Sequence, residues 1–174
     1  MNLPNKLTMM RVILIPVYMV LWHLEFPGSN YVALAVFITA SLTDFLDGYI
    51  ARKYNLVTNF GKFMDSLADK MLVLTVMTCF CAMGRFPDWV LVIVMVREFA
   101  VTGLRLVAVD NGRVIAAGWS GKVKAASTMV CLCLMHLPIP NLLGWVCVIV
   151  ITATTLYSGI EYFVLNRDVL NWNK

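Results

Sequence analysis

The chain has 174 residues, of which 60% are hydrophobic and 14% are charged, and its formal net charge is +4. Soluble domains average about 45–50% apolar and about 25% charged residues, so this composition excludes an ordinary soluble enzyme. The charge needs no nucleic acid partner, because lysines and arginines at a membrane face meet anionic lipid heads. We expect a single all-α polytopic membrane domain over residues 1–174, with six spans of about twenty residues.

Six apolar stretches predict six transmembrane helices, separated by turn-forming residues such as Gly, Pro and Asn. The predicted helices are Leu7–His23, Tyr31–Tyr54, Phe60–Met83, Asp88–Val109, Lys122–Leu137 and Asn141–Leu165. The 5 cysteines fall inside apolar runs. This position favours buried small side chains over metal ligands or disulfides.

Positive charge predicts the topology, because cytoplasmic loops of membrane proteins carry an excess of Lys and Arg. On the opposite side, Arg85 is the only Lys or Arg in the loops. We therefore expect both termini, and the junction of the second and third helices, to be cytoplasmic. The residues on or near that side are Lys6, Arg11, Arg52, Lys53, Lys62, Arg105, Arg113, Lys122, Lys124, Arg167 and Lys174.

Carboxylates gather at this junction, although each aspartate costs roughly 2.5–3.5 kcal/mol to insert into a bilayer. At about 100° per residue, polar and small residues of the second helix share one stripe of roughly 140°. A core-facing stripe would be apolar. The third helix repeats the pattern at spacing i, i+4, i+8. The two sets are Asp44, Asp47, Gly48, Ala51 and Arg52, then Gly61, Asp65 and Asp69.

Two facing helices can bring these four carboxylates to one place. Oxygen ligands without a nearby Cys or His favour Mg²⁺ or Mn²⁺ over zinc. Carboxylates one turn apart can bridge two ions about 3.5–4 Å apart, an arrangement suited to displacement at phosphorus. Gly48 and Ala51 leave space for a nucleotide, while Arg52 and Lys62 would meet phosphate charge.

Other interpretations of the pattern stay open. Gly48-x2-Ala51 alone is more often a helix-packing notch, and single Asp–Arg pairs in membranes are often structural. A cation transporter would place its carboxylates near the bilayer midplane in discontinuous helices. An inactive membrane subunit could also retain the residues. The complete pattern across two helices favours chemistry on a phosphate.

The pattern D-x2-D-G-x2-A-R-x8-G-x3-D-x3-D resembles the signature of the CDP-alcohol phosphotransferases. These are six-helix membrane enzymes, usually homodimers, that transfer a phosphoalcohol from a CDP-linked donor to a hydroxyl and release CMP. The resemblance implies that Asp44, Asp47 and Asp65 bind metal, and that Asp69 binds metal and serves as general base. Gly48, Arg52 and Thr58 resemble the donor-nucleotide contacts.

Further segments resemble the bacterial members that use glycerol 3-phosphate as acceptor. They are Met1-Asn-Leu-Pro-Asn-Lys-Leu-Thr8 with Arg11, Arg97-Glu98-Phe99 with Arg105, and Gly118-Trp-Ser-Gly-Lys122-Val-Lys124. The resemblance implies transfer from CDP-diacylglycerol to glycerol 3-phosphate at the cytoplasmic face of the inner membrane, giving phosphatidylglycerophosphate on the way to phosphatidylglycerol. The same chemistry with serine, inositol phosphate or phosphatidylglycerol as acceptor is the alternative.

The phosphate of glycerol 3-phosphate needs cations of its own. Arg105 at the end of the fourth helix and Lys122 at the start of the fifth are the best candidates. Arg97 lies two turns deeper on a similar face of the fourth helix. It either contacts the acceptor as well or forms an intramembrane pair with Glu98 or Glu161.

The remaining polar residues have less specific expectations. We expect Lys124 and Arg113 to meet lipid heads or to lie in loops. Asn5, Thr8 and Arg11 are candidates to close the nucleotide end of the site. Asn5 or Thr8 could equally serve the start of the first helix through capping or local turn bonds.

Overall fold

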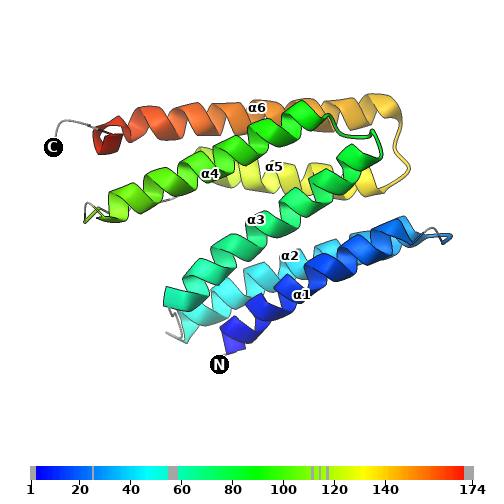
Figure 1. Ribbon diagram of the computed structural model, residues 1–174, viewed down its shortest axis with the longest axis horizontal. Helices are drawn as coiled ribbons and strands as arrows, with labels where there is room; N and C mark the ends of the chain where they lie inside the picture. Colours follow the sequence, from blue (N-terminus) through cyan, green and yellow to red (C-terminus); the bar gives the residue numbers. More distant parts are fainter. Residues whose placement is uncertain are drawn as a thin grey trace. The chain divides into compact units, whose positions relative to one another are not determined.

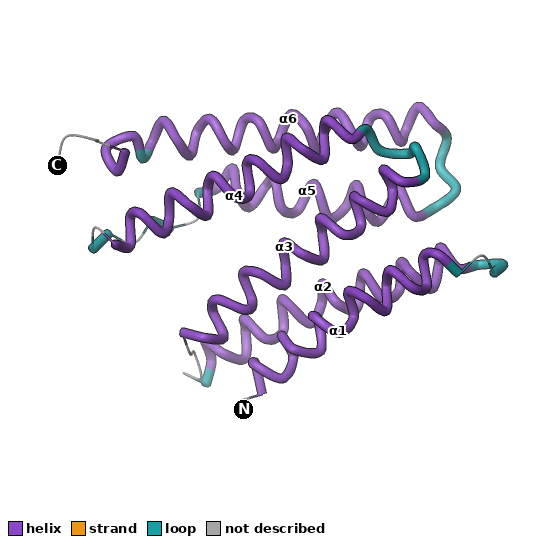
Figure 2. Tube along the Cα trace, viewed as in Figure 1, coloured by secondary structure: helices purple, strands orange, loops and turns teal. Residues whose placement is uncertain are grey.

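The computed structural model describes residues 3–24, 26–54, 59–110, 112–113, 115–116 and 118–170; for residues 3–5, 44–52, 59–60, 62–63 and 170 it describes the backbone alone. Throughout this part of the chain the regular structure is helical and contains no strand (Figure 2). The helices are α1 (Leu3–His23), α2 (Ser29–Lys53), α3 (Asn59–Ala82), α4 (Asp88–Asp110), α5 (Trp119–His136), α6 (Asn141–Leu165) and the short 3-10 helix η1 (Arg167–Leu170).

The all-α prediction is confirmed, and each predicted span coincides with one of the six long helices of the described chain. The start of α1 lies at Leu3, ahead of the predicted Leu7; Pro4 is compatible with this start, since proline is tolerated in the first turn of a helix. The same helix continues through Pro16. Similarly, α5 begins at Trp119, ahead of the predicted Lys122.

The end of α4 has a specific cause. The N–H of Gly112 donates to the carbonyl of Val109 (2.9 Å), and the N–H of Arg113 donates to that of Ala108 (2.8 Å). This is the hydrogen-bond pattern of a Schellman motif, which needs a left-handed residue after the helix. Gly112 has φ of 72°, which glycine adopts without steric cost. Gly112 is thus one of the turn-forming residues expected between the predicted helices.

Contacts between helices divide the chain into two units, Met1–Ala82 and Met83–Lys174. In the first unit α1 packs against both α2 and α3 (Figure 1). The rings of Tyr18 and Trp22 stack with centroids 5.9 Å apart, and Trp22 meets Phe80 edge-on at 5.0 Å. All three side chains are buried, so this aromatic cluster forms part of the core between α1 and α3.

In the second unit α6 packs against both α4 and α5. Val101, Leu104 and Tyr162 form a buried cluster, and Val169 of η1 packs on it. At the surface, Arg113 Nη1 donates to Asp168 Oδ2 at 3.2 Å. This hydrogen bond lowers the pKa of the exposed Asp168 carboxyl. The small contribution of this ion pair to the stability of the folded protein is therefore present at neutral pH. It is lost as the pH falls through the lowered pKa.

Two of the described helices are long and apolar enough to cross a membrane by length and composition. They are α1, over Lys6–His23, and α6, over Asn141–Leu165. A shorter apolar stretch covers Ser29–Thr43 of α2, a part of the helix whose side chains the structure describes.

Candidate active site

The four aspartates lie on the two helices that flank residues 54–58. Asp44 and Asp47 fall in the last turns of α2, and Asp65 and Asp69 fall in the first half of α3. The side chains of Asp44 and Asp47 lie outside the described residues. Asp65 and Asp69 are one helical turn apart; the Asp65 side chain is 41% exposed, and Asp69 is exposed. Both described carboxylates are thus accessible to a ligand.

The donor chemistry at this place fits a hard divalent cation. Both described aspartates offer oxygen only, on the same side of α3, which is what Mg²⁺ and Mn²⁺ prefer. Among the described side chains, no three potential metal ligands come together. Such a group would need Asp44 or Asp47 as well, so metal ligation by all four residues stays a prediction.

The predicted donor-nucleotide residues are spread over the first three helices. Thr58 and the side chains of Asn5, Gly48, Ala51, Arg52 and Lys62 lie outside the described residues. Of the rest, Thr8 is buried at 3% exposure on α1, and Gly61 is half-buried at the start of α3. The structure thus gives the helical positions of most members, and their contacts with a nucleotide stay predictions.

Arg11 contacts one of the aspartates directly. Its guanidinium is completely buried, and Nη1 donates to Asp65 Oδ1 at 3.0 Å. The Nε–H donates to the backbone carbonyl of Ala40 at 3.2 Å. Sequence reasoning placed Arg11 on the cytoplasmic side and at the nucleotide end of the site, and it named no partner residue. No spacing in the chain indicates its pairing with Asp65, which lies on a different helix.

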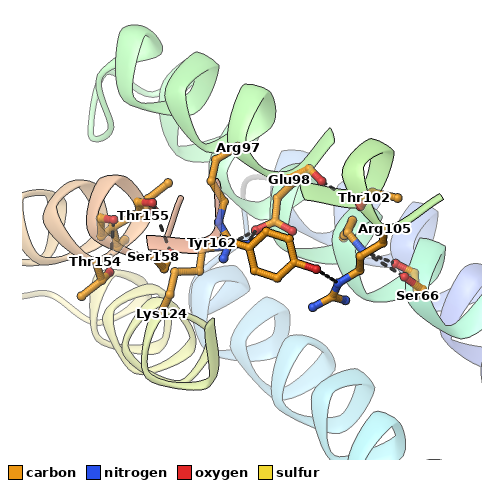
Figure 3. Close-up of polar contacts among 12 residues, drawn as sticks. Ser66, Arg97, Glu98, Thr102, Arg105, Lys124, Thr154, Thr155, Ser158 and Tyr162 are labelled. Carbon is orange, nitrogen blue, oxygen red and sulfur yellow. Dashed lines mark hydrogen bonds and ion pairs between the residues drawn. The ribbon is translucent and has the colours of Figure 1, made fainter. Parts of the chain in front are cut away.

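A buried group of three charges connects α4 to α5 in the second unit (Figure 3). Arg97 Nη1 and Lys124 Nζ both donate to Glu98 Oε1, at 2.9 Å and 2.5 Å. The three side chains are 13%, 7% and 13% exposed for Arg97, Lys124 and Glu98. One carboxylate therefore serves two cations, and the group carries a net positive charge.

Two glycines leave room for the Arg97 side chain. A Cβ atom at Gly159 of α6 would lie 3.2 Å from Arg97 Cγ, and one at Gly121 of α5 would lie 3.8 Å from Nη2. Of the two partners considered for Arg97, the structure selects Glu98. The expectation that Lys124 meets lipid heads or lies in a loop is wrong, because Lys124 is buried against the same carboxylate.

Arg105 is held by an aromatic residue that sequence reasoning missed. Its Nε donates to the hydroxyl of Tyr162 at 3.0 Å, and its guanidinium carbon lies 5.4 Å from the centre of the Tyr162 ring (Figure 3). Tyr162 is buried in the core of the second unit. It lies in the apolar run of α6, which gives no signal of a polar role. Lys122 is exposed in the first turn of α5.

The comparisons with known proteins agree across the chain. A family model described as CDP-alcohol phosphatidyltransferase matches residues 1–157. The CDP-diacylglycerol–glycerol-3-phosphate 3-phosphatidyltransferase of Bacillus subtilis is 39% identical, with 97% of each chain covered. A probable phosphatidylglycerophosphate synthase of Mycobacterium tuberculosis is 37% identical over 92% of this chain and 79% of its own. The chain belongs to the CDP-alcohol phosphatidyltransferase family.

Proposed function

We propose that this enzyme transfers the phosphatidyl group of CDP-diacylglycerol to glycerol 3-phosphate, giving phosphatidylglycerophosphate and CMP. The observation that carries the proposal is the complete aspartate pattern on α2 and α3, in a chain 39% identical over 97% of its length to an enzyme of that name. The resemblance of the segments around Arg97, Arg105 and Lys122 supports glycerol 3-phosphate as the acceptor.

We propose that two divalent metal ions, either Mg²⁺ or Mn²⁺, bind to Asp44, Asp47, Asp65 and Asp69. Members of this family generally depend on a divalent metal. When bound, the metal neutralises the pyrophosphate and the departing CMP, which is the main electrostatic demand of phosphoryl transfer. The accessible oxygen donors of Asp65 and Asp69 support this assignment.

Asp69 is our candidate general base. The acceptor hydroxyl is a poor nucleophile at neutral pH, so a carboxylate within reach must take its proton. The hydroxyl oxygen then bonds to the phosphorus that carries diacylglycerol. The bond from this phosphorus to the bridging oxygen breaks, and CMP leaves with the electron pair. A direct displacement needs no covalent enzyme intermediate. The exposure of Asp69 supports access by a substrate.

For the CDP head group we propose contacts from three helices of the first unit and from the α2–α3 connection. Arg52 and Lys62 supply positive charge to the phosphates, and the small residues leave space for the nucleotide. The proposed set is Asn5, Thr8, Gly48, Ala51, Arg52, Thr58, Gly61 and Lys62.

For the acceptor phosphate we propose Arg97, Arg105 and Lys122. Since Tyr162 occupies the Nε–H of Arg105, the terminal amino groups of the guanidinium can form a two-pronged contact with phosphate oxygens. Lys122 is exposed and can add a point charge. Arg97 shares Glu98 with Lys124, so these three residues keep one net positive charge, which attracts the acceptor phosphate.

We further propose six membrane spans in the bacterial inner membrane, with both termini and the aspartates at the cytoplasmic face, and a homodimeric assembly. The asymmetry of Lys and Arg along the chain supports this orientation. A lipid donor explains the location, because its acyl chains can stay in the bilayer while the CDP head reaches the aspartates.

A panel of acceptors tests the proposed substrate. Purified protein in mixed micelles is supplied with CDP-diacylglycerol and Mg²⁺ or Mn²⁺, and CMP release is measured with glycerol 3-phosphate, serine, inositol phosphate or phosphatidylglycerol. Of these four acceptors, we expect only glycerol 3-phosphate to support CMP release. Release with a different acceptor from the panel would keep the family chemistry and reject the substrate.

A further inference from the structure

Arg11 lies where the three helices of the first unit meet, and its side chain is completely shielded from solvent. Placing a guanidinium in such a position costs several kcal/mol unless its hydrogen bonds and its charge are satisfied. The side chain comes from α1 and contacts both other helices. Two of its partners are the carbonyl of Ala40 on α2 and the carboxylate of Asp65 on α3.

The two contacts use different nitrogens of one rigid, planar group. The Nε–H is anchored on the backbone of α2 at Ala40, a residue that is itself fully buried. Nη1 then meets Asp65 Oδ1 at 3.0 Å. Because a guanidinium holds its donors in a fixed fork, anchoring one nitrogen also fixes the direction of the other. The orientation of the Asp65 carboxylate is thereby set relative to the main chain of α2.

The contact engages one oxygen of a carboxylate that remains 41% exposed. A carboxylate has a second oxygen with free lone pairs, which can ligate a cation while the first accepts from Arg11. Hydrogen bonds of this kind, made to a ligand rather than to the ion, commonly change metal affinity by about 10–100-fold when removed.

We propose that Arg11 is a positioning residue for the metal site, holding the Asp65 carboxylate in the orientation in which it would bind the cation. The inference rests on the proposed function, in which Asp65 is a metal ligand. Arg11 also offsets part of the repulsion among the aspartates before metal binds. Lysine has a single donor nitrogen on a flexible stem, and cannot hold the Ala40 carbonyl and Asp65 in the same rigid geometry.

The test is a Mn²⁺ titration of the purified Arg11→Lys enzyme, with free Mn²⁺ followed by electron paramagnetic resonance. We expect the Kd for Mn²⁺ to rise about tenfold. CMP release should need correspondingly more Mn²⁺ for half-maximal rate and recover at saturating Mn²⁺. Ile15→Ala is the matched control, since Ile15 is buried on the same helix. It should lower the melting temperature without changing the Kd for Mn²⁺.

Asp65→Asn in the same titration separates this inference from the proposed function. Weaker Mn²⁺ binding in Asp65→Asn but an unchanged Kd in Arg11→Lys would overturn the positioning role alone. An unchanged Kd in Asp65→Asn would overturn the metal assignment and the inference with it. Arg11→Gln, which keeps amide donors without the charge, is titrated in parallel. Of Arg11→Lys and Arg11→Gln, the variant whose melting temperature lies closer to that of the wild type is the one whose Kd for Mn²⁺ tests the positioning role.

Discussion

Among the described side chains, Glu98 is the carboxylate that pairs with both Arg97 and Lys124. Replacing it with Gln would leave these two cations close together without a counter-charge from the described part of the chain. Breaking a buried ion pair from one side typically costs about 3–5 kcal/mol. We therefore expect Glu98→Gln to lower the melting temperature in detergent strongly.

Glu161→Gln is the control for this prediction, because Glu161 is a half-buried carboxylate on α6. It should melt close to the wild type. Equal melting temperatures for the two variants would contradict the assigned role of Glu98.

Tyr162 holds Arg105 through its hydroxyl and through the face of its ring. Phenylalanine would keep the ring and lose the hydrogen bond, which is worth about 1.5 kcal/mol or somewhat more when one partner is charged. If Arg105 binds the acceptor phosphate, Tyr162→Phe should raise the KM for glycerol 3-phosphate about tenfold with little change in kcat.

The KM for CDP-diacylglycerol should not change in Tyr162→Phe. Tyr157 lies on the same helix and is exposed, so Tyr157→Phe should leave both constants as they are. A fall in kcat with an unchanged KM for glycerol 3-phosphate would argue against a binding role for Arg105.

At the scale of the helix, α6 accommodates Arg97 because position 159 has no side chain. A methyl group there would lie 3.2 Å from Arg97 Cγ, so the arginine must shift. We expect Gly159→Ala to reduce stability or acceptor binding, although Ala is favoured over Gly within helices by about 1 kcal/mol. Thermal melts and the KM for glycerol 3-phosphate measure the two effects.

Gly144 provides the comparison within the same helix. A Cβ atom at Gly144 meets nothing within 4 Å, so Gly144→Ala should keep or raise the melting temperature. If Gly159→Ala behaves like Gly144→Ala in both measurements, the proposed fit between Gly159 and Arg97 is wrong.

Helix positions in this chain follow from local sequence, and for that reason could be predicted. Apolar length located the six long helices of the described chain, and glycine and proline located their ends; Gly112, with its left-handed backbone, is the clearest example. The errors lie at helix starts. Pro4 was compatible with a longer α1, and the polar first turn of α5 at Trp119 was not apolar enough to be recognised.

For the whole molecule, the candidate site was predictable in its residue types and less so in its contacts. The four aspartates identified the family because their spacing is a local pattern. The pairs Arg11–Asp65 and Arg105–Tyr162 join residues far apart in sequence, so only the packing of helices reveals them. Lys124 shows the same limit: its burial depends on Glu98 of another helix.

Metal-dependent transfer of a phosphatidyl group to glycerol 3-phosphate, with Asp69 as base, is tested most directly by measuring its two products, phosphatidylglycerophosphate and CMP. The wild type, Asp69→Asn and the surface control Asp168→Asn are compared with Mg²⁺ or Mn²⁺ and with a chelator. We predict that Asp168→Asn forms as much of each product as the wild type does. Asp69→Asn or the chelator should abolish them. Undiminished product formation by Asp69→Asn, or with all divalent metal removed, would contradict the account.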